Sequence, residues 1–202
     1  MQNVSIKGFI YTALSSATFG LAPFFTISLL LAGFSSFEVL AYRWGIASLT
    51  LVVFGIMLGE TFRISRKDWG TVFILSLLRA ATSFSLVIAY QNISSGVAST
   101  IHFMYPVLTT LIMMIFFHEK KSLWRMAAIA LAVAGVFFLS NGDGTGSVTW
   151  SGIFIVLLSA LGYALYLVTV SQLKNLEMKG LKMTFYVFLF GGILLFTGTE
   201  IS

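Results

Sequence analysis

The stretch that decides the fold is GVASTIHFMYPVLTTLIMMIFFHEKK, residues 96–121. It opens with small and polar residues, carries His102 and Pro106 through its middle, and then runs apolar until it stops at HEKK, residues 118–121. An apolar run of about 20 residues is long enough to cross the hydrocarbon core of a bilayer as a helix. This stretch therefore predicts a membrane-spanning helix that holds polar groups and ends where it reaches water.

The composition of the whole chain indicates the same class of protein. Of its 202 residues, 58% are hydrophobic and 9% are charged, and the mean hydropathy is +0.97. A soluble domain has about 25% charged residues. With no cysteine, two histidines and seven acidic residues, the chain has little material for a metal site or a catalytic cluster. We expect no cofactor, no metal and no enzymatic activity.

Seven apolar segments of about 20 residues follow one another along the chain. They are too long for strands and lack the alternation of a β-barrel. The sequence therefore predicts an all-α integral membrane protein, a polytopic bundle of about seven transmembrane helices. The segments are approximately Ile6–Ala32, Phe37–Gly59, Trp69–Gln91, Ser94–Phe117, Leu123–Ser140, Trp150–Gln172 and Leu181–Thr199.

The basic residues lie on alternate links between these segments. Ten of the twelve lie on these links or within three residues of a segment end, whereas Arg43 and Arg79 lie deeper inside segments. Because positive charge accumulates on cytoplasmic loops, this pattern predicts a cytoplasmic N-terminus. It also argues against a nucleic-acid partner, since the charge follows the loops and forms no basic face. The basic residues on the links or at the adjoining segment ends are Lys7, Arg63, Arg66, Lys67, Lys120, Lys121, Arg125, Lys174, Lys179 and Lys182.

Polar residues recur at helical spacing inside four segments. Polar groups within a bilayer face the bundle interior or a water-filled cavity, so aligned stripes favour a polar central cavity. Packing between helices, in which Ser and Thr link neighbours, is the alternative for each hydroxyl. The stripes are Tyr11, Ser15, Thr18 and Ala22; Ser76, Arg79, Ser83 and Tyr90; Ser95, Ser99, His102, Pro106 and Thr109; and Ser159, Gly162, Tyr163 and Tyr166.

A weak internal repeat appears when the chain is shifted by about 144 residues. Residues 8–22 then fall on residues 152–166, with Ser15 on Ser159 and Phe19 on Tyr163. The shift spans five helices, and an odd number inverts the second copy in the membrane, as in many secondary transporters. We therefore expect a five-helix repeat over residues 1–140 and the start of a second over residues 150–202. Ten helices would complete the pair, so we expect the chain to be a fragment.

The second half of the first repeat resembles EamA-type members of the drug/metabolite transporter superfamily. Small residues after the third helix, a proline within the fourth, a glutamate closing it and an Ala/Gly-rich fifth helix carry the resemblance, together with an aromatic-Gly pair in the first helix and an arginine early in the second. Here these are Gly96, Ala98, Ser99, Pro106, Glu119, Ala132 to Gly135, Phe19–Gly20 and Arg43. The resemblance implies two inverted five-helix halves around a central cavity. Arg79 departs from it, since a small or neutral residue is expected there.

Six residues are candidates for binding a substrate, and one for a latch at the cytoplasmic end. An arginine near the middle of the bilayer needs a partner, so Arg79 either meets an anionic group of the substrate or has a structural role. His102 is either a proton carrier or a hydrogen-bonded structural residue. Glu119 is either the latch or an interfacial ion-pairing residue. The substrate-binding candidates are Arg79, His102, Tyr105, Pro106, Ser15 and Tyr163.

These features predict a transporter, an exporter of a small metabolite or amino acid by alternating access. A cationic drug efflux transporter is the alternative, although the first segment has no carboxylate. A seven-helix receptor would require an external N-terminus, against the charge pattern. The resemblance implies a multi-pass protein of the bacterial inner membrane whose partners are membrane lipids and a small-molecule substrate, and it leaves a homodimer open.

Overall fold

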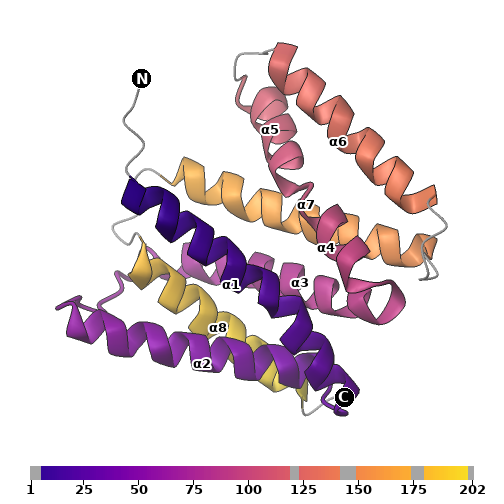
Figure 1. Cartoon of the computed structure of the whole chain (residues 1–202). Coiled ribbons are helices and arrows are strands. Elements are labelled where there is room, and N and C mark those ends of the chain that lie inside the picture. Colours follow the sequence, from indigo (N-terminus) through magenta and orange to yellow (C-terminus); the bar gives the residue numbers. More distant parts are fainter. Residues whose placement is uncertain (1–5, 119–122, 142–148, 174–179, 200–202) are drawn as a thin grey trace. The chain divides into compact units, whose positions relative to one another are not determined.

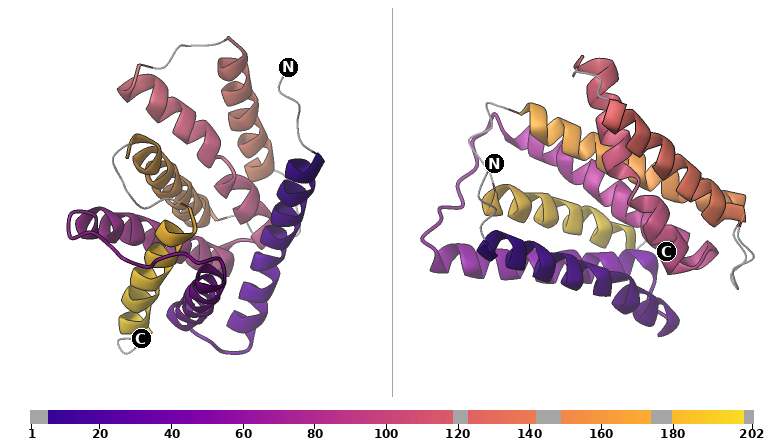
Figure 2. Two further views of the ribbon diagram at one scale, coloured as in Figure 1. Left: turned by 90° about the vertical axis from the view of Figure 1, so that its left-hand side faces the viewer. Right: turned by 45° about the horizontal axis from the view of Figure 1, so that its top comes forward.

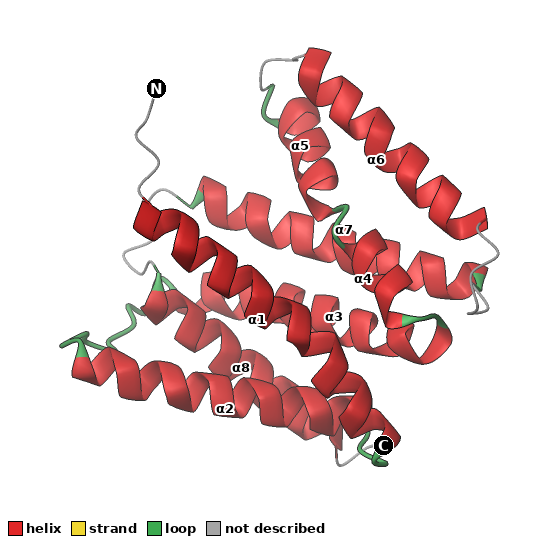
Figure 3. Cartoon of the chain, viewed as in Figure 1, coloured by secondary structure: helices red, strands yellow, loops and turns green. Residues whose placement is uncertain are grey.

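The computed structural model describes residues 6–118, 123–141, 149–173 and 180–199, and within these ranges every regular element is a helix (Figure 3). The predicted all-α class is confirmed, and most segment ends agree with the predicted ends to within two residues. The helices are α1 (Ile6–Leu31), α2 (Ser36–Met57), α3 (Trp69–Asn92), α4 (Ser95–His102), α5 (Tyr105–Phe116), α6 (Leu123–Asn141), α7 (Trp150–Gln172) and α8 (Leu181–Thr199).

Five stretches of the described chain are long and apolar enough to cross a membrane. They are Ser36–Met57, Trp69–Asn92, Ser95–Phe116, Trp150–Gln172 and Leu181–Thr199. Each has 19 to 24 residues, and at 1.5 Å per residue such a helix spans about 30 Å. The chain is therefore a multi-pass membrane protein built as a helical bundle.

The chain divides into two compact units, residues 1–34 and residues 35–202. Unit 1 contains α1, which runs for 26 residues with Pro23 inside it. Its hydroxyl groups bond within the helix: Ser28 Oγ donates to the Phe24 carbonyl at 2.9 Å, and Thr18 Oγ1 to the Leu14 carbonyl at 3.0 Å. Such bonds satisfy hydroxyl groups inside a helix without a partner from a neighbouring helix.

Within unit 2, helices that are far apart in the sequence pack side by side. α2 lies along α8, and α3 packs against both α7 and α8 (Figure 1). α4 and α5 also contact α7, while α6 contacts α5 and α4 (Figure 2). α3 and α7 therefore make the central contacts of unit 2.

The contacts of the helix ends show that α3 runs antiparallel to both α2 and α7. At one end, Gln91 Nε2 donates to Ser36 Oγ at 3.0 Å, so α3 ends where α2 begins. Thr149, just before α7, donates to the Asn92 carbonyl at the same end. At the other end, Tyr186 Oη donates to the Phe62 carbonyl at 3.0 Å and ties α8 to the link between α2 and α3.

The sequence sets the limits of α2 by local hydrogen bonds. Ser35 and Glu38 form a capping box, in which Ser35 Oγ accepts from the Glu38 N–H and Glu38 Oε2 accepts from the Ser35 N–H at 2.7 Å. At the other end Gly59 has a φ of +74°, and the Glu60 N–H donates to the Gly55 carbonyl at 2.9 Å. This left-handed turn favours glycine and ends the helix. Glu38 therefore has a local partner at the helix end.

The fourth predicted segment differs from a single continuous helix. α4 ends at His102, Phe103 and Met104 form a turn, and α5 begins at Tyr105. Proline lacks an N–H and its ring collides with the carbonyl one turn earlier, so the first turn of a helix is the position where Pro106 fits without a kink. Pro106 occupies that position. The predicted stripe also stops there, because Pro106 is exposed whereas His102 is buried.

Candidate functional site

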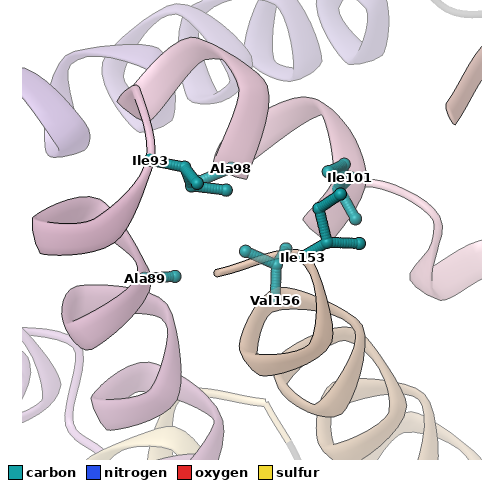
Figure 4. Close-up of a cluster of buried hydrophobic side chains, with 6 residues drawn as sticks. All are labelled: Ala89, Ile93, Ala98, Ile101, Ile153 and Val156. Carbon is teal, nitrogen blue, oxygen red and sulfur yellow. The ribbon is translucent and has the colours of Figure 1, made fainter. Parts of the chain in front are cut away.

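A cluster of small and branched apolar side chains fixes α4 against α3 and α7. Its buried members come from the end of α3, from α4 and from the start of α7 (Figure 4): Ala89, Ile93, Ala98, Ile101, Ile153 and Val156. Gly152 lets the helices approach, since a Cβ there would lie 2.5 Å from Ile93 Cγ2. In lipid, helices associate by close packing of this kind. The cluster places His102, directly after Ile101, against α7.

His102 belongs to a buried chain of hydrogen bonds that joins three helices. Ser159 Oγ of α7 donates to the Thr82 carbonyl of α3 at 2.7 Å and lies 3.2 Å from His102 Nδ1 of α4. Ser159 is fully buried and His102 is 4% exposed. Because an unpaired buried polar group is costly in lipid, this chain holds the last turn of α4 in place.

Three tyrosine rings, one histidine ring and one guanidinium group meet beside these hydrogen bonds, and we call them the tyrosine–arginine cluster. Its members are Arg79, His102, Tyr105, Tyr163 and Tyr166. The Tyr163 ring lies at its centre: its centroid is 4.6 Å from that of Tyr105, 5.8 Å from that of His102 and 5.9 Å from that of Tyr166. Arg79 Cζ lies 4.7 Å from the Tyr163 centroid.

Arg79 lies within the membrane-spanning part of α3 with modest local support. Its Nη1 donates to Ser83 Oγ at 3.3 Å, and its guanidinium group covers the Tyr163 ring. A cation–π contact contributes about 0.5–2 kcal/mol and a hydrogen bond about 0.5–1.5 kcal/mol. Placing an arginine at the centre of a bilayer helix costs about 2.5–3.5 kcal/mol. The contacts therefore roughly offset this cost and add little stability beyond it.

Several other polar residues of the predicted stripes bond within their own helix. Ser76 Oγ donates to the Val72 carbonyl and Thr109 Oγ1 to the Tyr105 carbonyl, at 2.7 and 2.8 Å. Tyr90 Oη and Ser99 Oγ are 3.3 Å apart and link α3 to α4. Among the described residues, no group of three His, Asp or Glu is placed to hold a metal ion. The chemistry of the site is that of hydrogen bonds, aromatic rings and one cation.

The structure brings four of the predicted binding residues together, namely Arg79, His102, Tyr105 and Tyr163. Pro106 follows Tyr105 but is exposed, and its role is to begin α5. Ser15 lies on α1 in unit 1, and its side chain is outside the described part of the chain, as is the whole of Glu119.

Two members of the site appeared in the sequence as part of a polar stripe but not among the binding candidates, and a third did not stand out at all. Ser159 and Tyr166 share the helical face of Tyr163, and this spacing was the signal that pointed to them. Thr82 contributes its main-chain carbonyl. A carbonyl acceptor leaves no trace in a side-chain pattern, so no sequence signal identifies it.

Comparison with known proteins gives several similar transporters. The chain is 26% identical over 140 residues to "Uncharacterized transporter YdfC" of Bacillus subtilis (strain 168), covering 68% of this chain and 45% of that protein. It is 30% identical over 162 residues to an uncharacterized transporter of Archaeoglobus fulgidus, covering 80% of this chain and 56% of that protein. Solute carrier family 35 member G1 of Mus musculus is 27% identical over 132 residues, covering 65% and 35%.

The chain spans about half the length, or less, of these curated relatives. No solved structure matches it significantly. The family model described as "EamA-like transporter family" matches residues 6–141, which is most of the chain and includes Arg79, His102 and Tyr105. Together with the helical membrane fold, this match shows that the chain belongs to the EamA-like transporter family of the drug/metabolite transporter superfamily.

Proposed function

We propose that the protein exports a small metabolite or amino acid with an anionic group, by alternating access across the cell membrane. The observation that carries this proposal is the position of Arg79 in the membrane-spanning helix α3, where its guanidinium group lies over the Tyr163 ring of α7. Among the described residues, the structure records no ion pair for Arg79, and its hydrogen bond goes to the neutral Ser83. A planar guanidinium group in such a setting is suited to bind a carboxylate with two hydrogen bonds.

The charges around the site favour an anionic group over a cationic drug. The described acidic residues, Glu38, Glu60 and Asp68, lie at or just beyond the helix ends and away from the tyrosine–arginine cluster. Arg43 of α2 lies within electrostatic range of Arg79 and adds a second positive charge. A cationic substrate would be repelled by these groups, whereas an anionic group would be attracted.

The break between α4 and α5 supports alternating access. Secondary transporters commonly bind substrate beside interrupted transmembrane helices near the middle of the bilayer. Here His102 ends α4 and Tyr105 begins α5, and both rings belong to the tyrosine–arginine cluster. A change in the angle between the two helices would move Tyr105 relative to His102. The site would then change as access changes from one side of the membrane to the other.

The proposal is tested by transport in liposomes with the unmodified protein and its Arg79→Gln and Arg79→Lys variants. Panels of labelled amino acids and organic acids would be loaded inside and their efflux measured. Loss of a charge that pairs with a carboxylate costs about 2–5 kcal/mol, so we expect Arg79→Gln to slow efflux about 30-fold or more. Arg79→Lys keeps the charge but not the planar geometry, so we expect an intermediate rate.

Arg66→Gln is the matched control, because it removes an exposed arginine from the link between α2 and α3. We expect it to leave the efflux rate unchanged. The thermal melting temperature of each variant in detergent separates loss of binding from loss of folding. An Arg79→Gln protein that folds and exports anionic substrates at the normal rate would refute the proposal. Efflux of organic cations alone would favour a cationic drug transporter instead.

A further inference from the structure

The hydrogen-bond chain at His102 determines which ring nitrogen carries a proton. The Thr82 carbonyl can only accept, so the single proton of the Ser159 hydroxyl group is used in the 2.7 Å bond to it. Ser159 Oγ can then act only as an acceptor toward His102 Nδ1, which lies 3.2 Å away. Nδ1 must therefore be the donor, and His102 carries its proton there.

The opposite nitrogen of the ring is left as an acceptor. His102 is buried, and among the described residues no carboxylate contacts it, so a neutral ring is favoured over a charged one. A neutral imidazole protonated at Nδ1 has a lone pair at Nε2. The described residues provide no hydrogen-bond donor to Nε2, and the ring lies beside Tyr105 and Tyr163, whose centroids are 5.9 and 5.8 Å away.

We propose that Ser159 is a positioning residue that holds His102 in the Nδ1–H form, so that Nε2 accepts a hydrogen bond from a donor group of the transported molecule. The recognition half of this inference rests on the proposed function, whereas the tautomer half does not. Arg79 and His102 both lie against the Tyr163 ring, so a carboxylate and a donor group would be bound on the same tyrosine. An ammonium group beside a carboxylate, as in an α-amino acid, meets both requirements.

The tautomer is measured directly by nitrogen NMR of protein labelled with ¹⁵N-histidine. The chain has two histidines, so a His118→Gln background leaves His102 as the single signal. Bare and protonated imidazole nitrogens have well-separated resonances. We expect the Nδ1 resonance at the protonated position and the Nε2 resonance at the bare position. In Ser159→Ala we expect both to shift toward an average, because the acceptor that selects one tautomer is gone.

Thr82→Val is the matched control for this measurement. It removes a neighbouring hydroxyl group on the same helix contact but keeps the main-chain carbonyl that accepts from Ser159. We expect it to leave both resonances unchanged. A protonated Nε2 in the unmodified protein would overturn the proposal, and so would unchanged resonances in Ser159→Ala. These results require no transported molecule and stand apart from the outcome of the transport assays.

The recognition half is tested by adding two mixtures to the labelled protein. One contains neutral L-amino acids, and the other the carboxylic acids that have the same side chains and no amino group. We expect the Nε2 resonance to shift with the amino acids alone. A shift with both mixtures, or with neither, would overturn the assignment of Nε2 to a donor group.

His102→Asn adds a second variant, because its amide nitrogen can still donate to Ser159 while the Nε2 acceptor is lost. We expect it to keep the normal melting temperature and lose amino acid binding.

Discussion

At the scale of single residues, Thr82 shows how one side chain serves the site through its main chain. Its carbonyl accepts from Ser159, whereas its hydroxyl group is buried and has no hydrogen-bond partner among the described residues. The same hydroxyl group faces α7 closely, since a Cβ on Gly162 would lie 2.7 Å from Thr82 Oγ1. An unpaired buried hydroxyl group costs about 1–3 kcal/mol. The shape of Thr82 is therefore useful to the packing, while its polarity is not.

Thr82→Val is expected to leave the melting temperature unchanged or to raise it, because a methyl group of similar size replaces the unpaired hydroxyl group. Ser159→Ala is expected to lower the free energy of unfolding by about 1–3 kcal/mol, because it leaves the Thr82 carbonyl and His102 Nδ1 unpaired. Thermal unfolding of both variants in the same detergent measures the contrast. A Thr82→Val protein that is less stable than Ser159→Ala would contradict it.

The residues of the site were predicted where their side chains are polar and lie inside a helix. Arg79, His102 and Tyr163 stood out because a polar group in a bilayer must face other protein groups, and helical spacing gives its face. These three do lie together. The link from Ser159 to a main-chain carbonyl could not be predicted, because it depends on how closely α3 and α7 approach. That distance is set by packing and not by periodicity.

At the scale of elements, the division of the fourth segment into α4 and α5 is the main departure from the predicted fold. Hydropathy alone predicts one span from Ser95 to Phe116, because the turn at Phe103 and Met104 is as apolar as the residues around it. The proline was visible in the sequence, but a proline kinks some helices and divides others. The packing of α4 against Ile153 and Val156 fixes its last turn. The chain therefore divides at the turn before Pro106.

The packing of α2 against α8 can be tested by substituting two adjacent glycines of α8, Gly191 and Gly192. A Cβ on Gly191 would overlap the ring of the buried Trp44, whereas a Cβ on Gly192 would lie 3.5 Å from Trp44 Cβ, an ordinary contact. Overpacking costs about 1–3 kcal/mol, so we expect Gly191→Ala to lower the melting temperature. Gly192→Ala should leave it unchanged or raise it, since alanine favours the helix by about 1 kcal/mol over glycine. Equal melting temperatures for the two variants would show that Trp44 moves freely.

At the scale of the whole molecule, the packing of unit 2 relates to the predicted repeat. A shift of 144 residues places the start of α2 near the start of α8, and these two helices lie along each other (Figure 1). Helices next to a two-fold axis in the membrane plane would meet their own counterparts in this way. The inverted repeat stays a prediction, and the α2–α8 contact is the feature of unit 2 that it would explain.

The orientation of the bundle in the membrane is predicted from charge and can be tested on the two flanks of α3. Thr61 lies on the link before α3, next to Arg63, Arg66 and Lys67, and Ser94 lies on the link after it; both side chains are exposed. Positive residues favour the cytoplasmic side, so Thr61 should face the cytoplasm and Ser94 the outside. Because the chain has no cysteine, Thr61→Cys and Ser94→Cys each introduce a single thiol group.

An impermeant thiol reagent added to intact cells should label Ser94→Cys, and Thr61→Cys only after the membrane is permeabilised. The reverse pattern would place the N-terminus outside, and the charge on the links would then have another cause. Labelling of both positions in intact cells would mean that α3 does not cross the membrane. Arg79 would then no longer lie at the depth at which its cost was estimated, and the case for an anionic substrate would fail with it.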